Sequence, residues 1–145
     1  MKIRGMRISD YDEVYSLWRS LAGMGLNDAD DSKDGIGRFL DRNPETCFVA
    51  EEDGKIIGAV IAGNDGRRGY IYHMAVSKEH RRQKLGTKLL DACLGAFRRL
   101  GIIKSALVVF SRKGGNAFWE KNGFSVRNDL LYRDRVLLEA NRLDT

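Results

Sequence analysis

The segment from Glu79 to Leu90, EHRRQKLGTKLL, joins clustered cations and one glycine to the start of a helical apolar pattern. A helix start presents unpaired backbone N–H groups and the positive end of the helix dipole, and both attract phosphate oxygens. Gly86 lets a ligand approach the backbone closely, and the Thr87 hydroxyl adds a hydrogen-bond donor. Further charge comes from four basic side chains: Arg81, Arg82, Lys84 and Lys88. The segment predicts a phosphate-binding helix start, and the alternative is a cationic helix start that binds nothing.

Composition restricts the partners that such a site serves. The 145 residues carry a net charge of +5 with a pI near 9.4, which suits either nucleic acid or a small polyanionic cofactor. No apolar run approaches the roughly 20 residues of a membrane span, and the charged first residues do not resemble a signal peptide. Cys47 and Cys93 match no metal or redox spacing. We expect a single cytoplasmic domain over residues 1–145, without membrane attachment or a metal.

The elements that position the basic turn follow from apolar periodicity and turn signals. A strand at 68–76 precedes the turn, and a helix from about 83 to 100 follows it. Asp53-Gly54 and Asp65-Gly66 predict tight turns between strands. Elsewhere we expect helices starting at Ser9 and Ser32 and over 114–123, and strands at 1–7, on both sides of Asp53-Gly54, at 102–110, from 124 and at 130–139.

This element order defines a fold class. A strand, two helices and an antiparallel meander are followed by a strand–helix–strand crossover and a closing hairpin. Such an order implies an α/β (α+β) fold with a mixed, mostly antiparallel sheet of about six to seven strands and about four flanking helices.

Two motifs in this order resemble the GNAT superfamily of N-acetyltransferases. HMAVSKEHRRQKLGTKLL is similar to its central motif, in which an Arg/Gln-x-x-Gly-x-Gly/Ala turn follows a strand and opens a helix; here the pattern falls on Arg81, Lys84 and Gly86. FWEKNGF, at 118–124, resembles the later motif of that superfamily. The resemblance spans residues 46 to 124, and the predicted topology agrees with it.

The resemblance implies acetyl-coenzyme A as co-substrate. Backbone amides of Arg82 to Thr87 would hold its pyrophosphate, Met74 and Val76 would pair with its pantetheine arm, and an N–H near Met74 or Ala75 would bind the developing oxyanion. The implied cofactor-binding residues are Met74, Ala75, Val76, Arg81, Arg82, Gln83, Lys84, Leu85, Gly86, Thr87 and Asn116.

A catalytic base is expected, because the acceptor amine must lose a proton before it attacks. The resemblance implies that this base lies on the strand before the turn and acts directly or through water. On GYIYHMAV, Tyr70, Tyr72 and Met74 are expected on one face, and Ile71 and His73 on the other. His73 has a suitable intrinsic pKa, and Tyr72 is placed to position water or to protonate the thiolate. For each, a purely structural role stays open. Weaker candidates are Tyr132, Glu51 and Glu52.

This chain departs from the superfamily pattern at three positions. Lys84 replaces a glycine, and we expect it to be helical, where lysine costs nothing. Trp119 matches the tyrosine that protonates the thiolate in many relatives, and tryptophan has no acidic proton to supply. Arg112 matches a common asparagine, for which Asn116, one helical turn later, is a substitute.

The acceptor is the least specified partner. The acidic segment 28–34, DADDSKD, falls where the superfamily builds its acceptor wall, which favours a cationic amine; a solvated loop is the alternative. We expect a small-molecule or peptide amine as partner, and a homodimer stays open. Alternative functions are acetylation of protein N-termini or lysines, a non-catalytic acyl-coenzyme A sensor and, against the absence of any nucleic-acid-binding signature, a nucleic-acid-binding module.

Overall fold

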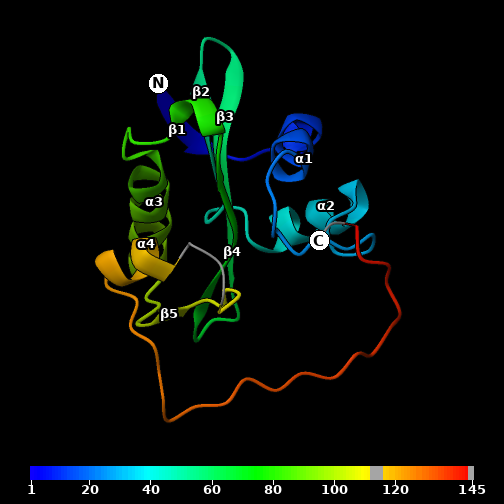
Figure 1. Ribbon diagram of the computed structural model, residues 1–145, viewed down its shortest axis with the longest axis vertical. Helices are drawn as coiled ribbons and strands as arrows, with labels where there is room; N and C mark the ends of the chain where they lie inside the picture. The colour runs from blue at the N-terminus through cyan, green and yellow to red at the C-terminus, as the bar shows by residue number, and fades with distance from the viewer. Residues whose placement is uncertain (112–115, 144–145) are drawn as a thin grey trace.

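The computed structural model describes residues 1–111 and 116–143, which form a five-stranded sheet in the order β1-β2-β3-β4-β5 (Figure 1). The strands are β1 (Lys2–Gly5), β2 (Phe48–Glu52), β3 (Lys55–Asn64), β4 (Gly69–Val76) and β5 (Ser105–Ala106). Neighbours from β1 to β4 pair antiparallel, and β5 pairs parallel to β4. The predicted mixed, mostly antiparallel sheet is therefore present.

Both predicted tight turns join strands of this meander. Asp53 and Gly54 have φ values of 52° and 75°, the positive values that a two-residue hairpin turn requires. At the next turn, Asp65 Oδ1 accepts hydrogen bonds from the Arg67 and Arg68 N–H groups, both at 2.8 Å. The side chains that signalled each turn in the sequence thus fix the register of β2, β3 and β4.

Within the described residues, four α-helices flank the sheet. Figure 1 shows that they cover both of its faces. They are α1 (Tyr11–Arg19) and α2 (Lys33–Arg42) on one face, and α3 (Leu85–Arg99) and α4 (Asn116–Lys121) on the other. Ser32 caps α2 as predicted, because its Oγ accepts the Gly35 N–H at 3.0 Å. Ser9 does not cap α1: a 3-10 turn precedes that helix, and the Asp10 carboxylate accepts the Arg7 N–H at 2.8 Å.

Each face of the sheet has its own apolar core. Val14, Trp18 and Ile36 are buried between the sheet and α1 and α2. Leu89 and Phe97 of α3 are buried on the opposite face. Burial of such side chains supplies about 1.5–3 kcal/mol each, so β3 and β4, packed on both sides, are the rigid centre of the fold.

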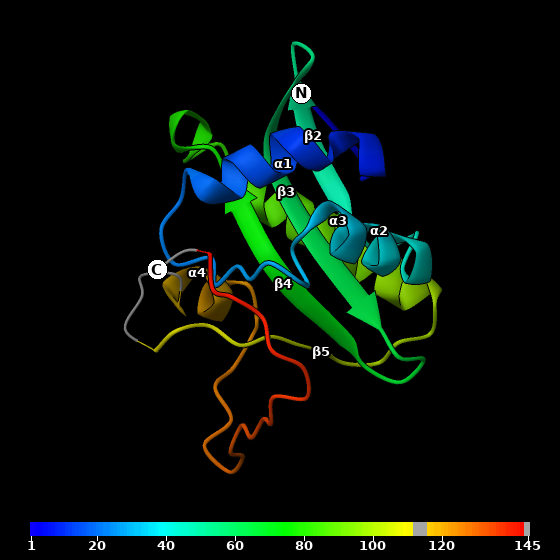
Figure 2. The same cartoon turned by 90° about the vertical axis from the view of Figure 1, so that its right-hand side faces the viewer.

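The prediction of six to seven strands is wrong for the described residues. Of the expected strand at 102–110, only β5 forms, and the residues from 125 to 140 run as an irregular, exposed C-terminal arm away from the sheet (Figure 2). Strand-like alternation needs an adjacent sheet edge, and β5 diverges from β4 after two residue pairs. The arm returns at its end, where Leu143 N–H donates to the Leu26 carbonyl at 2.9 Å.

Candidate active site

The outer edge of β4 is open over most of its length. β5 pairs only with Gly69 and Tyr70, and within the described residues no strand pairs with this edge from Ile71 onward. Ser77 N–H donates to Ile57 of β3, so the alternating direction of strand amides turns the N–H of Val76, the next residue back, toward the open edge. The predicted cofactor strand therefore presents unpaired backbone donors and acceptors that an extended ligand can use.

The basic turn follows directly from this edge, and Lys84 is not helical as predicted. The helix α3 begins at Leu85, and Lys84 is its N-cap with φ 58° and ψ 25°, in the left-handed region. Arg82 also has a positive φ, of 72°. A left-handed conformation costs an ordinary L-residue about 1–2 kcal/mol, so both residues are strained in a turn that glycine would form freely.

The start of α3 offers both amides and charge. Its first N–H groups lack partners within the helix, and Leu85, 2% exposed, anchors the helix start in the core. Arg81, Arg82, Lys84 and Lys88 are exposed, and none of them forms an ion pair within the described residues. This combination of directed amides and uncompensated cations is suited to a phosphate or diphosphate.

Gly86 has a packing role that the sequence did not reveal, and its predicted role of letting a ligand approach the backbone stays a prediction. A Cβ at this position would lie 3.1 Å from Phe118 Cε1, so the glycine allows α4 to approach α3. Trp119 is buried between Phe118 and Phe124, at ring distances of 5.0 and 5.4 Å. Trp119 is thus part of the core, and this explains why the position holds an apolar ring.

Asn116 is the first residue of α4, and its Nδ2 donates weakly, at 3.4 Å, to the Ser111 carbonyl. Arg112, the other residue of the predicted substitution, lies outside the described residues.

A β-bulge interrupts β4 at His73. Ala75 pairs with Ala59, but Tyr72 pairs with Ile61, so His73 and Met74 together oppose Val60. His73 adopts φ 48°, and the extra residue reverses the alternation of side chains. The predicted faces are therefore wrong for two residues, since His73 joins Tyr72 on the α1 and α2 face and Met74 packs on the α3 face.

His73 is held by contacts that the sequence did not reveal. Its Nε2 lies 2.8 Å from Asp31 Oδ1, and its ring meets Trp18 edge to face at 5.0 Å. Asp31 is 4% exposed, and its other oxygen accepts the Asn27 N–H at 2.9 Å. The loop between α1 and α2 thereby brings a buried carboxylate to the bulge.

Tyr70 and Tyr72 lie on the same face as His73, with ring centroids 4.8 Å apart. Burial first, and then neighbouring tyrosines, raise the pKa of Tyr70; burial, Tyr132 and the Asp30 carboxylate raise the pKa of Tyr72. Both phenols therefore keep their protons at neutral pH, as a proton donor must. Tyr132, on the exposed arm, is near enough to influence both.

Comparison with known proteins identifies the family. Residues 11–124 match the acetyltransferase (GNAT) family model. The chain belongs to the GNAT family of acetyltransferases. It is 28% identical over 143 residues to an acetyltransferase of Sodalis glossinidius, covering 96% of this chain and 97% of that protein. It is 34% identical over 109 residues to an acetyltransferase of Photorhabdus laumondii, covering 75% of each.

The fold agrees with this assignment. The structure of PaiA N-acetyltransferase from Thermoplasma acidophilum, in complex with coenzyme A, superposes with a TM-score of 0.74 at 18% identity, covering 88% of this chain and 91% of that one. Ard1 from Thermoplasma volcanium superposes with a TM-score of 0.72 at 23% identity, covering 84% and 80% of the two chains. At these identities the likeness shows the GNAT fold, and the sequence relatives establish an acyltransferase.

The remaining acidic candidates in this GNAT acetyltransferase have partners. Arg4 lies 2.9 Å from both Glu51 and Asp10, and Glu52 lies 3.1 Å from His80. In the segment 28–34, Asp28 accepts the Asn141 N–H at 2.7 Å. Glu51 and Glu52 are therefore engaged at the far end of the hairpin, away from the bulge.

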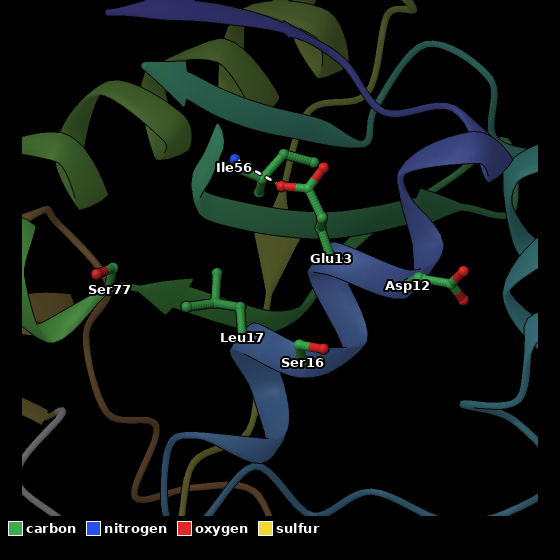
Figure 3. A pocket seen from close by; sticks show the side chains of 6 residues that line it. All are labelled: Asp12, Glu13, Ser16, Leu17, Ile56 and Ser77. Atoms are coloured by element: carbon green, nitrogen blue, oxygen red, sulfur yellow. Dashed lines mark hydrogen bonds between the residues drawn. The ribbon is translucent and has the colours of Figure 1, made fainter. Parts of the chain in front are cut away.

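A cavity of about 390 Å³ lies between α1 and the ends of β3 and β4 (Figure 3). Its lining residues are Asp12, Glu13, Ser16, Leu17, Ile56 and Ser77. Glu13 Oε2 accepts the Ile56 N–H at 3.1 Å, which ties α1 to β3. None of the predicted catalytic or cofactor-binding residues lines this cavity.

In residues 1–111 and 116–143, no three His, Cys, Asp or Glu side chains gather as metal ligands. Over the same part of the chain, no helix has the length and apolar character of a membrane span.

Proposed function

We propose that this GNAT acetyltransferase moves the acetyl group of acetyl-coenzyme A to a primary amine by direct attack, with both substrates bound together. The observation that carries this proposal is that the open edge of β4 and the start of α3 follow one another directly in the fold. The open edge of β4, with Met74 and Val76, leads into the unpaired amides and free cations at the start of α3. A ligand with an extended amide-bearing arm and a diphosphate at its end matches both.

The residues present fit this co-substrate. The β4 edge offers strand-like pairing to the pantetheine amides, and the amides from Arg82 to Thr87 face the diphosphate site at the helix start. Arg81, Lys84 and Lys88 supply charge that no carboxylate of the described chain neutralises. The coenzyme A complex of the PaiA neighbour, which shares this fold, supports the same ligand here. Acetyl-coenzyme A supplies an activated thioester, so the protein needs to align the amine and stabilise charge.

The bulge supplies the chemistry on the acceptor side. We assign proton abstraction to His73 and protonation of the departing thiolate to Tyr72, with Tyr70 as its neighbour on the same face. The raised pKa of Tyr72 keeps its phenol protonated for this role. A backbone N–H at Met74 or Ala75 stabilises the developing oxyanion.

The acceptor proposed is a cationic amine. Support comes from the acidic loop, where the Asp30 carboxylate is close enough to raise the pKa of Tyr72, and Asp34 is exposed. Asp31 is buried against His73 and does not belong to an exposed wall. A protein N-terminus or a lysine side chain meets the same charge requirement and is an alternative acceptor.

Cofactor binding is tested by thermal denaturation with and without acetyl-coenzyme A. At a concentration of about 100 Kd, binding stabilises the folded state by about 2.7 kcal/mol, which is a shift of several degrees for this size. Gly86→Glu places an anion at the helix start and is expected to abolish the shift. Gly95→Glu is the matched control, because it adds the same charge to the same helix where a side chain meets only Arg99 Nη1, at 3.4 Å.

Because Gly86→Glu also crowds Phe118, Arg81→Glu is the second variant. Arg81 is exposed with φ −69°, so the change keeps the backbone and is expected to weaken binding about tenfold. Wild-type protein without any shift would refute the proposed co-substrate. Thiol release measured with a panel of amines then separates enzyme from sensor: binding without release for any amine would favour the sensor.

A further inference from the structure

We propose that Asp31 is a positioning residue that fixes the tautomer of His73, so that Nδ1 of His73 takes the proton of the attacking amine. This inference rests on the proposed function, because it assigns the base of that reaction.

Hydrogen bonds to His73, Asn27 and Tyr11 fix Asp31 in place. Oδ1 faces His73 Nε2 at 2.8 Å, and Oδ2 accepts the Asn27 N–H at 2.9 Å. Its backbone carbonyl accepts the Tyr11 hydroxyl at 2.7 Å, which ties the loop to α1. At 4% exposure the side chain has no freedom to turn away. The carboxylate therefore presents one oxygen to His73 and has the other committed to the backbone.

His73 is held with equal rigidity. The bulge gives it φ 48°, and its ring forms a T-shaped pair with the ring of Trp18, which is fully buried. The side chain keeps 14% exposure. Within the described residues, Nδ1 of His73 has no hydrogen-bond partner. The buried side-chain polar atoms that lack a partner are Trp18 Nε1 and Ser105 Oγ, so Nδ1 is not buried. Nδ1 is thus the nitrogen that solvent or a substrate reaches.

The tautomer follows from these contacts. A carboxylate only accepts hydrogen bonds, so Nε2 must carry the hydrogen that bridges to Asp31. A neutral imidazole has one such hydrogen, which leaves a lone pair on Nδ1. When the amine nitrogen bonds to the thioester carbon, its proton moves to Nδ1. The C–S bond then breaks, its electron pair leaves with the sulfur, and the imidazolium is stabilised by Asp31.

The decisive variant is Asp31→Asn. The Asn27 N–H still requires an acceptor, so the new amide places its oxygen there and turns its NH2 toward His73. Nε2 must then accept, the hydrogen moves to Nδ1, and the lone pair no longer faces the amine. We expect kcat to fall about 100-fold, as for loss of a general base, with KM for acetyl-coenzyme A changed less than about twofold. Asp41→Asn, an exposed carboxylate of α2, is the control and should leave kcat unchanged.

The tautomer is measured directly by ¹⁵N NMR of the imidazole, recorded over a pH series so that the signal of the neutral ring is identified. The chain has two histidines, so His80→Gln leaves His73 as the single signal. We expect hydrogen on Nε2 with Asp31 and on Nδ1 after Asp31→Asn. Hydrogen on Nδ1 in the protein with Asp31, or an unchanged kcat after the tautomer switches, would overturn the assignment.

A second variant covers the case in which Asp31→Asn does not fold. His73→Asn removes the base and keeps a residue type that tolerates positive φ. It should lose the same factor in kcat, and retained activity would overturn the inference. The thermal shift with acetyl-coenzyme A should persist in every folded variant. If the variants keep both the thermal shift and the wild-type kcat, the Asp31–His73 pair is rejected and the proposed co-substrate stands. If the wild-type protein shows no thermal shift, the proposed co-substrate itself is rejected.

Discussion

The bulge of β4 and the turn before α3 both place non-glycine residues at positive φ, and the surrounding structure supports the two segments in opposite ways. His73, at the bulge of β4, has φ 48°, and Arg82 and Lys84, in the turn before α3, have φ 72° and 58°. The bulge is enclosed by a buried carboxylate and an aromatic ring. The turn is exposed, and Lys84 makes no side-chain cap to α3.

The difference indicates what stabilises each segment. Strained residues persist only where the surrounding structure determines their conformation. At His73, contacts with Asp31 and Trp18 hold the backbone conformation without any ligand. At the turn the exposed side chains provide little, and on the proposed function the bound diphosphate compensates the strain. The acceptor side is then preformed, and the cofactor side is completed by its ligand.

His73→Val is expected to have the largest effect on stability. It leaves the buried Asp31 oxygen without a donor and forces a β-branched residue into the left-handed region, for a combined cost of about 3–4 kcal/mol. His73→Asn loses the same hydrogen bond without the backbone penalty. Urea denaturation of both variants should therefore separate them by about 1–2 kcal/mol, and equal midpoints would mean that the bulge conformation carries no strain.

The bulge also marks the limit of what the sequence predicts. Local signals were sufficient at Asp53-Gly54, at Asp65-Gly66 and at the Ser32 cap, because each depends on side chains within three residues of the backbone they bind. The position of the bulge depends on contacts of His73 with residues 42 and 55 positions away, Asp31 and Trp18. No alternation rule includes such contacts, and the sequence therefore put His73 on the wrong face.

Two other errors have the same origin. The helical pattern of Leu85 and Leu89 gave the start of α3 within two residues, but the pattern does not report φ at the cap, where Lys84 is left-handed. Alternation at 130–139 suggested a strand, but a strand also requires a free edge beside it, and the arm runs away from the sheet. Motif spacing predicted the family correctly, because it depends on order along the chain.

Lys84→Gly tests the turn with an effect of intermediate size. Glycine removes a left-handed penalty of about 1–2 kcal/mol and adds unfolded-state entropy worth about 0.5–1 kcal/mol, so the unliganded protein should gain about 0.5–1 kcal/mol. The lost cation should weaken acetyl-coenzyme A binding about threefold at low salt and less at high salt. Calorimetric titration and urea denaturation measure the two effects.

Lys88→Ala is the matched control for this variant, because it removes an exposed cation from the first turns of the regular helix α3. It should weaken binding by a similar factor without the gain in stability. If Lys84→Gly instead destabilises the unliganded protein, the turn is braced by the lysine and the contrast with His73 disappears.

The smallest effect on stability is expected for the ion pair between His80, in the turn before α3, and Glu52 of β2. His80 Nε2 lies 3.1 Å from Glu52, and the two side chains are 23% and 36% exposed. A pair this open to solvent contributes less than about 0.5 kcal/mol, because water screens the charges and both side chains lose rotamer freedom. A double-mutant cycle of Glu52→Gln and His80→Gln measures that coupling by urea denaturation. A coupling above about 1 kcal/mol would mean that the protein braces the turn as firmly as it holds the bulge, and the ligand would then have no strain to offset.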